Sequence, residues 1–290
     1  MLQVQAVEDL RREIGRWRKE GKRVGFVPTM GALHEGHLSL VGLARSVQSG
    51  QGGHADRVVV SVFVNPTQFG PNEDFTRYPR QPERDAGMLK RAGCDLLFLP
   101  EVETMYPPGN TVYVDLGSPS EGLEGHFRPG HFRGVATVVA LLFNLVQPDV
   151  AVFGEKDAQQ LAVVRKLVRD LHFPVEIVAA PTIREEDGLA MSSRNAYLSP
   201  EERRSAAVLH RSLRAAEAAI AAGERRGDEV RRILSRMLNS EPLARVEYAE
   251  VVDAETFQPV ETLKGRLVLP LAVRVGGTRL IDNLQLAVEG

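Results

Sequence analysis

Apolar and polar positions follow two regular patterns over the first two thirds of the chain. Segments with apolar residues at helical spacing predict amphipathic helices, and short continuous apolar runs predict strands that are buried on both faces. The predicted helices are residues 5–20, 34–47, 82–92 and 155–171. The predicted strands between them are residues 24–29, 57–64, 95–100, 149–154 and 175–181. This alternation indicates right-handed crossovers and an α/β fold, a parallel sheet with helices on both faces.

The pattern changes beyond residue 199. Ser199 followed by Pro200 is a typical helix start, and helices are predicted at 199–223 and 227–240. Antiparallel strands are predicted after them, and Gly276-Gly277 joins the last two. These strands lie in residues 246–253, 266–275 and 278–288. We therefore divide the chain into residues 1–182 and a smaller C-terminal α+β domain, residues 183–290, with antiparallel strands.

Composition and charge exclude several classes of protein. The chain has 290 residues and a net charge of -2, which argues against a protein that coats nucleic acid. It has neither the run of about 20 apolar residues that spans a bilayer nor a signal peptide, so we expect a cytoplasmic protein without a membrane partner. Cys94, a single cysteine, excludes an internal disulfide and predicts a core residue. Residues 49–55 are predicted to form a flexible loop.

Candidate chemistry begins just after the first buried strand, at the sheet edge where ligands bind in such folds. His34 and His37 lie three residues apart where a helix is predicted to begin, and Gly36 lets a ligand approach the backbone. A helix N-terminus binds phosphate, and an imidazole donates hydrogen bonds or a proton to it. The alternative, two solvated turn histidines, is disfavoured by the HxGH spacing.

Three further segments follow predicted strands or lie at the domain junction. Lys156 begins a helix after a glycine turn, with Gln160 one turn later, and residues 191–194 combine two serines with Arg194 as an anion-binding group. Residues 65–70 place amides at a strand end, and residues 71–82 are predicted to act as a lid. Each segment alone also fits an ordinary loop or helix start. Phosphate-loop, dinucleotide and metalloprotease motifs are absent.

Together these segments resemble the pantoate–β-alanine ligase family. The matching sequences are PTMGALHEGH (28–37), FVNPTQFGPNEDFTRYPR (63–80), FGEKDAQQ (153–160) and MSSRNAYLS (191–199), in the family's order and spacing. The resemblance implies a Rossmann-like N-terminal domain, a smaller domain that closes over the site, and a homodimer. It implies that ATP and Mg²⁺ adenylate (R)-pantoate with release of pyrophosphate, and that β-alanine then attacks the pantoyl adenylate to give pantothenate and AMP.

The same resemblance assigns roles to individual residues. His37, the proton donor, His34, Lys156 and Arg194 are the implied catalytic residues. Gln68 and Gln160 match the pantoate-binding glutamines, and Gln68 also matches the β-alanine site. The implied ATP-binding residues are Met30, Gly31, Ala32, Leu33, His34, Glu35, Gly36, His37, Gly154, Glu155, Lys156, Asp157, Ile183, Met191, Ser192, Ser193 and Arg194.

Three residues outside this set are weighed from their position. Asp85 is interpreted as a metal neighbour, although most ligands of Mg²⁺ are expected to be phosphate oxygens and water. Arg128 and His131 either line the acid or amine pocket or form a structural turn.

The implied chemistry fits these residue types. A carboxylate that attacks phosphorus is already deprotonated, so the difficulty is the negative charge that accumulates on the phosphates. Lys156 and Arg194 are therefore assigned to transition-state stabilisation. The alternatives are a nucleotidylyltransferase that acts on a small phosphorylated substrate and a non-catalytic nucleotide sensor. A transfer-RNA ligase is disfavoured because the chain has no evident basic extension.

Overall fold

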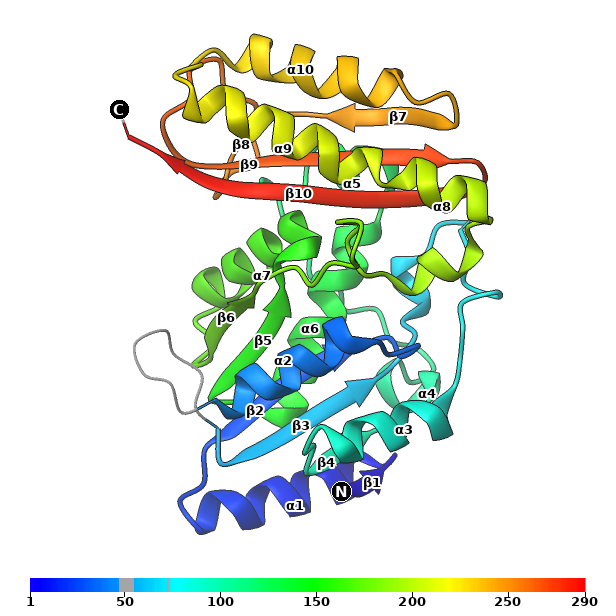
Figure 1. Ribbon diagram of the computed structural model, residues 1–290. Coiled ribbons are helices and arrows are strands. Elements are labelled where there is room, and N and C mark those ends of the chain that lie inside the picture. The colour runs from blue at the N-terminus through cyan, green and yellow to red at the C-terminus, as the bar shows by residue number, and fades with distance from the viewer. Residues whose placement is uncertain (47–54, 72, 290) are drawn as a thin grey trace. The chain divides into compact units, whose positions relative to one another are not determined.

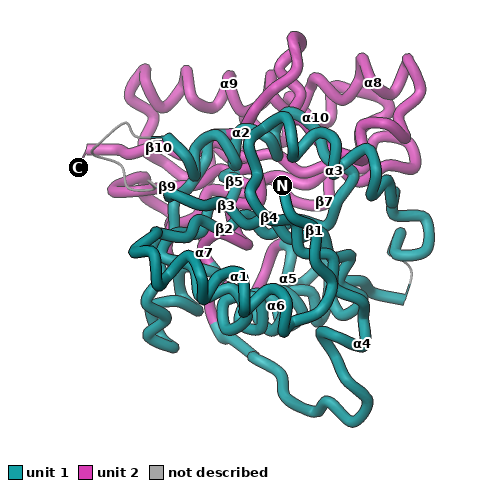
Figure 2. The backbone as a smooth tube through the Cα atoms, turned by 90° about the horizontal axis from the view of Figure 1, so that it is seen from below, with its two compact units in different colours: residues 1–117, 124–155, 163–181 teal, residues 118–123, 156–162, 182–290 magenta. Residues whose placement is uncertain are grey.

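The computed structural model describes residues 1–46, 55–71 and 73–289, so most of the loop predicted at residues 49–55 lies outside the described residues. The chain forms two compact units (Figure 2). Unit 1 comprises residues 1–117, 124–155 and 163–181, and unit 2 comprises residues 118–123, 156–162 and 182–290. Unit 2 therefore includes two short segments from the N-terminal part of the chain, residues 118–123 and residues 156–162, and the second contains the beginning of a helix.

Unit 1 is built on a six-stranded sheet in the order β1-β4-β3-β2-β5-β6, and every pair in it is parallel. Its strands are β1 (Leu2–Val4), β2 (Val24–Thr29), β3 (Arg57–Val62), β4 (Leu96–Phe98), β5 (Val150–Gly154) and β6 (Glu176–Ala180). The central strands are buried on both faces, as continuous apolar runs require. The predicted parallel sheet is confirmed.

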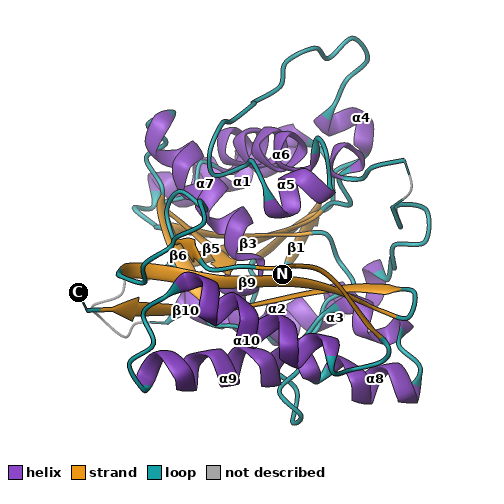
Figure 3. Ribbon diagram, turned by 90° about the horizontal axis from the view of Figure 1, so that it is seen from above, coloured by secondary structure: helices purple, strands orange, loops and turns teal. Residues whose placement is uncertain are grey.

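Helices cover both faces of this sheet (Figure 3). On one face lie α2 (Glu35–Arg45) and α3 (Pro82–Arg91), and on the other lie α1 (Val7–Lys19) and α6 (His131–Val146). The remaining helices of this part of the chain are α4 (Val102–Met105), α5 (Leu123–Phe127) and α7 (Ala158–Asp170). In α1 the apolar stripe Leu10, Ile14 and Trp17 is buried, so helical periodicity found the face that packs.

The strand order places the end of β2 at a topological switch point. From β2 the chain proceeds through β3 to β4 on one side, and it returns to form β5 and β6 on the other side (Figure 1). Ligands of open α/β sheets bind beyond the carboxyl ends of the strands at such a point. The HxGH segment follows β2, and Gly154 ends β5, so both lie where the fold rule places a ligand.

Unit 2 packs helices on one face of an antiparallel sheet of β7 (Ala244–Ala249), β8 (Val252–Asp253), β9 (Gly265–Val275) and β10 (Thr278–Val288). The turn at Gly276-Gly277 joins β9 to β10 in register from Val275↔Thr278 onward. The helices of this unit are α8 (Pro200–Ala206), α9 (Val208–Ala221) and α10 (Gly227–Asn239). Leu213, Leu234 and Leu271 belong to their common core. The predicted helix-plus-antiparallel arrangement is confirmed.

Three details differ from the sequence-based elements. Residues 199–223 form two helices, α8 and α9, and residues 155–157 form a 3-10 turn before α7. No strand was predicted at β1, since three residues are too few to show a period. No helix was predicted at α6, which is apolar around most of its circumference, as a buried helix is. In the described part of the chain, no helix is long and apolar enough to cross a membrane.

Candidate active site

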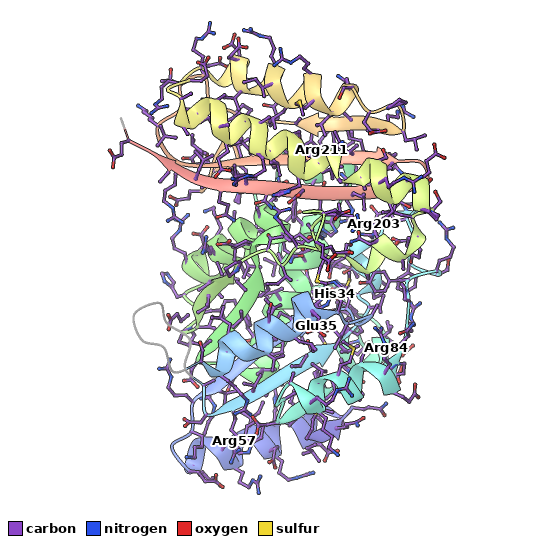
Figure 4. The ribbon with its side chains drawn as sticks, viewed as in Figure 1. His34, Glu35, Arg57, Arg84, Arg203 and Arg211 are labelled. Carbon is purple, nitrogen blue, oxygen red and sulfur yellow. The ribbon has the colours of Figure 1, made fainter. Side chains whose placement is uncertain are left out.

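The HxGH segment forms a tight turn from β2 into α2. Gly31 (φ +87°) and Ala32 (φ +51°) adopt left-handed backbone conformations, and His34 is the N-cap residue of α2 (Figure 4). The backbone N–H of His34 donates to Nδ1 of His37 at 3.3 Å, and the two imidazole centroids are 4.1 Å apart. The structure therefore brings both predicted histidines together at a helix N-terminus, which favours anions.

Asp85 of α3 holds this turn in shape. Its carboxylate is 1% exposed, and its two oxygens accept hydrogen bonds from the backbone N–H groups of Ala32 and Leu33, both at 2.9 Å. A β-carbon at Gly31 would lie 3.2 Å from Asp85 Oδ2, so glycine leaves room for the carboxylate. The structure thus shows Asp85 as the support of the HxGH turn, and the metal-neighbour interpretation stays a prediction.

Gln68 lies in a 3-10 turn, η1 (Pro66–Gln68), directly after β3. Its side-chain oxygen accepts a hydrogen bond from Asn65 Nδ2 at 2.9 Å. The same Asn65 amide donates to the Gly134 carbonyl on α6 at 3.2 Å, and Tyr106 donates its hydroxyl to Asn65 Oδ1 at 2.9 Å. Asn65 therefore orients the Gln68 amide so that its nitrogen remains for a ligand. The sequence alone did not assign this role to Asn65.

Arg128 and His131 form a second network around Gln68. Arg128 donates to Glu73 through Nε (2.8 Å) and Nη2 (2.6 Å), and its Nη1 lies 3.1 Å from His131 Nε2. His131 Nδ1 lies 2.9 Å from the Gln68 carbonyl oxygen. Since that oxygen can only accept, the neutral ring carries its proton on Nδ1 and accepts from Arg128. The two residues therefore shape the Gln68 turn, in agreement with the structural alternative.

Burial and the adjacent Arg128 guanidinium lower the pKa of His131 to about 4. The unfolded chain then binds the extra proton from about pH 6.5 downward, whereas the folded chain does not. This contribution to stability is full above pH 6.5 and is lost as the pH falls toward 4, by up to about 1.4 kcal/mol per pH unit. We expect His131→Gln to flatten the unfolding free energy over that range. Urea titrations at several pH values measure this free energy. The prediction is contradicted if its slope against pH is the same in His131→Gln as in the parent protein.

Residues 156–162, which follow Glu155 after the end of β5, belong to unit 2. Lys156 lies in the 3-10 turn η2 (Glu155–Asp157), with its ammonium 3.9 Å from Asp157 Oδ2. Gln159 is 5% exposed, and its amide donates to the carbonyl of Pro119 at 3.0 Å. Gln160 is half-buried. Gln159 thus has a structural task, and the assignment of Gln160 to pantoate stays a prediction.

Residues 183–194 form a compact hairpin followed by a turn. Met191 N–H donates to the Ile183 carbonyl at 3.0 Å, which pairs the two predicted nucleotide-binding residues. Ser192 caps the 3-10 turn η3 (Ser193–Tyr197) by accepting from Arg194 N–H at 3.3 Å. Gly188 (φ +88°) packs against His210, where a β-carbon would be only 2.0 Å from its Nδ1. The predicted serine–arginine group therefore lies in one capped 3-10 turn directly after the hairpin.

A family model described as pantoate-beta-alanine ligase matches residues 3–285. The chain belongs to the pantoate–β-alanine ligase family. Pantothenate synthetases of Thermoanaerobacter sp. (strain X514) and Moorella thermoacetica are each 52% identical to it, over 98% and 99% of both chains. These matches confirm the family resemblance carried by the four sequence segments.

Solved structures agree with this assignment. Pantothenate synthetase from Thermus thermophilus has a TM-score of 0.92 and 50% identity, covering 99% of this chain and 100% of that one. Pantoate-beta-alanine ligase from Francisella tularensis, complexed with beta-gamma ATP and beta-alanine, has a TM-score of 0.76 and 33% identity, covering 98% and 97%. The fold is therefore that of the pantoate–β-alanine ligase family.

Cys94 has the structural role that the sequence predicted. It is 5% exposed and donates its thiol to the Leu96 carbonyl at 3.2 Å. Burial raises its pKa to about 12. The thiol therefore stays protonated at neutral pH, as expected of a core residue rather than a nucleophile.

Proposed function

We propose that the chain condenses (R)-pantoate with β-alanine at the expense of ATP. A pantoate carboxylate oxygen attacks the α-phosphorus and pyrophosphate leaves. The β-alanine nitrogen then attacks the acyl carbon, and AMP leaves with the oxygen that came from pantoate. Membership of the pantoate–β-alanine ligase family, shown over residues 3–285, is the observation that carries this proposal. The cytoplasmic location stays a prediction.

In unit 1, the HxGH turn is assigned to the ATP phosphates. Its helix N-terminus supplies N–H groups and a positive dipole end, and the contact of His34 with His37 fixes how the imidazoles present their nitrogens. His37 is assigned as the proton donor. Met30–Gly36 and the end of β5, Gly154 and Glu155, complete the assigned backbone contacts.

In unit 2, Lys156 and Arg194 are assigned to the negative charge that develops on the phosphates. Asp157, Ile183, Met191, Ser192 and Ser193 are assigned to the rest of the nucleotide. The amides of Gln68 and Gln160 are assigned to pantoate, and Gln68 also to β-alanine. An amide both donates and accepts, so it suits a ligand that carries hydroxyls and a carboxylate. The orientation of Gln68 by Asn65 supports this assignment.

Magnesium fits this chain as an ion that arrives on ATP. Among the described residues, no group of three His, Cys, Asp or Glu side chains forms a ready metal site, and both Asp85 oxygens already accept backbone hydrogen bonds. Mg²⁺ commonly keeps several waters and binds substrate phosphates with few protein ligands. When bound, it would neutralise phosphate charge. We therefore assign its ligands mainly to phosphate oxygens and water.

Residues 71–82 are assigned as a lid that excludes water from the mixed anhydride. Residue 72 lies outside the described part of the chain. Phe75 packs edge-on to Phe69 at 5.3 Å, and the Arg80 guanidinium lies over the Phe75 ring at 5.2 Å. Such contacts would give the segment a defined resting position.

We also propose that two copies of the chain form a homodimer. Val112 and Tyr113 of unit 1 are apolar yet 74% and 47% exposed, and adjacent exposed apolar residues favour a protein contact. We expect Val112→Glu to shift the protein from dimer to monomer. Sedimentation velocity measures this, with the exposed Leu171→Glu as control. Val112→Glu that stays dimeric would remove this segment from the interface.

The proposed function is tested by the products of the full reaction. With ATP, Mg²⁺, (R)-pantoate and β-alanine, AMP, pyrophosphate and pantothenate should form in equal amounts. With pantoate withheld, none should form. If a phosphorylated substrate replaced pantoate and accepted the nucleotide, the nucleotidylyltransferase alternative would hold. If ATP bound but no product formed in any of these reactions, the sensor alternative would hold.

A further inference from the structure

Two adjacent polar residues are buried in the middle of β10. Asp282 is 2% exposed and Asn283 is 5% exposed, although the strand continues into the apolar residues of the unit 2 core. Buried polar side chains are costly unless they are hydrogen-bonded. Successive residues of a strand point to opposite faces, so the two side chains serve different neighbours.

Asp282 points toward the helix-covered face and binds Arg184. Arg184 donates through Nη1 to Oδ2 at 2.7 Å and through Nη2 to Oδ1 at 3.0 Å, a bidentate pair. The same guanidinium donates to the Gly188 carbonyl at 3.0 Å. Arg184 follows Ile183 directly and is paired with Ala190. Asp282 thus ties the base of the 183–191 hairpin to the sheet.

Asn283 points to the other face and binds the turn that carries Lys156. Its Nδ2 donates to the Lys156 carbonyl oxygen at 2.9 Å. Val268 of β9, opposite Gln285 in register, packs on this face against Ala158 and Ala162 of α7. The first turn of α7 is therefore packed against β8 and β9 by one apolar cluster. The η2 turn before it is held by one directed hydrogen bond from β10, which ends on the residue assigned to phosphate charge.

We propose that Asp282 and Asn283 are positioning residues for the phosphate-binding side chains of unit 2. Asp282 fixes the hairpin that leads into the Ser192–Arg194 turn, and Asn283 fixes the backbone from which the Lys156 ammonium reaches its target. This inference rests on the proposed function, because it needs Lys156 to act on the phosphates. A misplacement of about 1 Å at a reacting group costs on the order of 10²-fold in rate, so a single backbone anchor matters.

The test variant is Asn283→Ala, which removes the amide and leaves Asp282 in place. We expect the single-turnover rate of adenylation at saturating ATP to fall about tenfold, the effect of one hydrogen bond of typical strength. The Kd for ATP, measured by calorimetry, should stay within about twofold. Pantothenate formation from preformed pantoyl adenylate should keep its rate, because Lys156 is assigned to the first step. Gln285→Ala, on the same face of β10, is the matched control and should leave all three quantities unchanged.

A double-mutant cycle with Lys156→Ala separates positioning from general support of the fold. Once the ammonium is gone, the placement of its backbone should no longer matter, so Asn283→Ala should add less than a twofold effect in the Lys156→Ala protein. A full tenfold effect in both backgrounds would overturn the inference and leave the proposed function standing. If Lys156→Ala adenylates pantoate as fast as the parent protein, the proposed role of Lys156 fails, and the inference fails with it.

Discussion

Lys156→Ala should lower the rate of pantoate adenylation by about 10²-fold or more, as the loss of one preorganised charge donor does in other active sites. Lys156 lies two residues after Gly154, the last residue of β5, and β5 pairs with β2 at the switch point of the strand order. Its backbone is held by Asn283, and its side chain is only 22% exposed. A flexible surface lysine has neither restraint, so the loss should appear in kcat.

The matched control is Lys166→Ala on the same helix region. Lys166 pairs with Asp170 on the surface of α7 and lies outside the assigned site. It should leave kcat unchanged and alter stability by less than about 0.5 kcal/mol, since exposed ion pairs contribute little. Rapid-quench measurement of the rate at which pantoyl adenylate forms distinguishes the two variants. Equal kcat for Lys156→Ala and the parent protein would refute the transition-state role.

Asp85→Asn should have the second large effect, a fall of about 10²-fold in kcat together with a loss of about 2 kcal/mol of unfolding free energy. The parent carboxylate accepts from two backbone N–H groups, those of Ala32 and Leu33. An amide of the same size offers only one acceptor, so its NH₂ group would face a second donor. The HxGH turn would then lose the geometry that presents His34 and His37.

Magnesium concentration distinguishes this positioning role from a metal-binding role for Asp85. A displaced turn is not restored by more metal, so the Asp85→Asn rate should stay low at every Mg²⁺ concentration. Recovery at high Mg²⁺ would show instead that the carboxylate serves the ion. Glu83→Gln, which changes an exposed carboxylate of the same helix, should match the parent protein in rate and stability.

Strands with a continuous apolar run and helices with a clear apolar period were predictable from the sequence, because the residue types alone show which positions are buried. The strand predicted at 24–29 is β2 itself, and the buried stripe of α1 follows from Leu10, Ile14 and Trp17. The short β1 was not predictable, since its partner β4 lies far along the chain and only pairing across that distance makes it a strand. The break between α8 and α9 likewise carries no proline or glycine signal.

The site was predictable as far as its motifs are local. His34 and His37 are three residues apart, which is about one helical turn, and their contact follows from that spacing. The supports of the site come from distant segments. Asp85 reaches the HxGH turn from α3, and Asn283 reaches Lys156 from the last strand. Two adjacent polar residues between the apolar residues Ile281 and Leu284 were the available signal for Asp282 and Asn283, but only the tertiary structure identifies their partners.

The transfer of oxygen from pantoate to AMP tests the central claim most directly. (R)-Pantoate labelled with oxygen-18 in its carboxylate is converted in one pot with ATP, Mg²⁺ and β-alanine, and the products are analysed by mass spectrometry. Attack of the carboxylate on the α-phosphorus predicts one labelled oxygen in AMP and none in pyrophosphate. Unlabelled AMP, or label in pyrophosphate, would show that the acid is not activated as an acyl adenylate and would contradict the account.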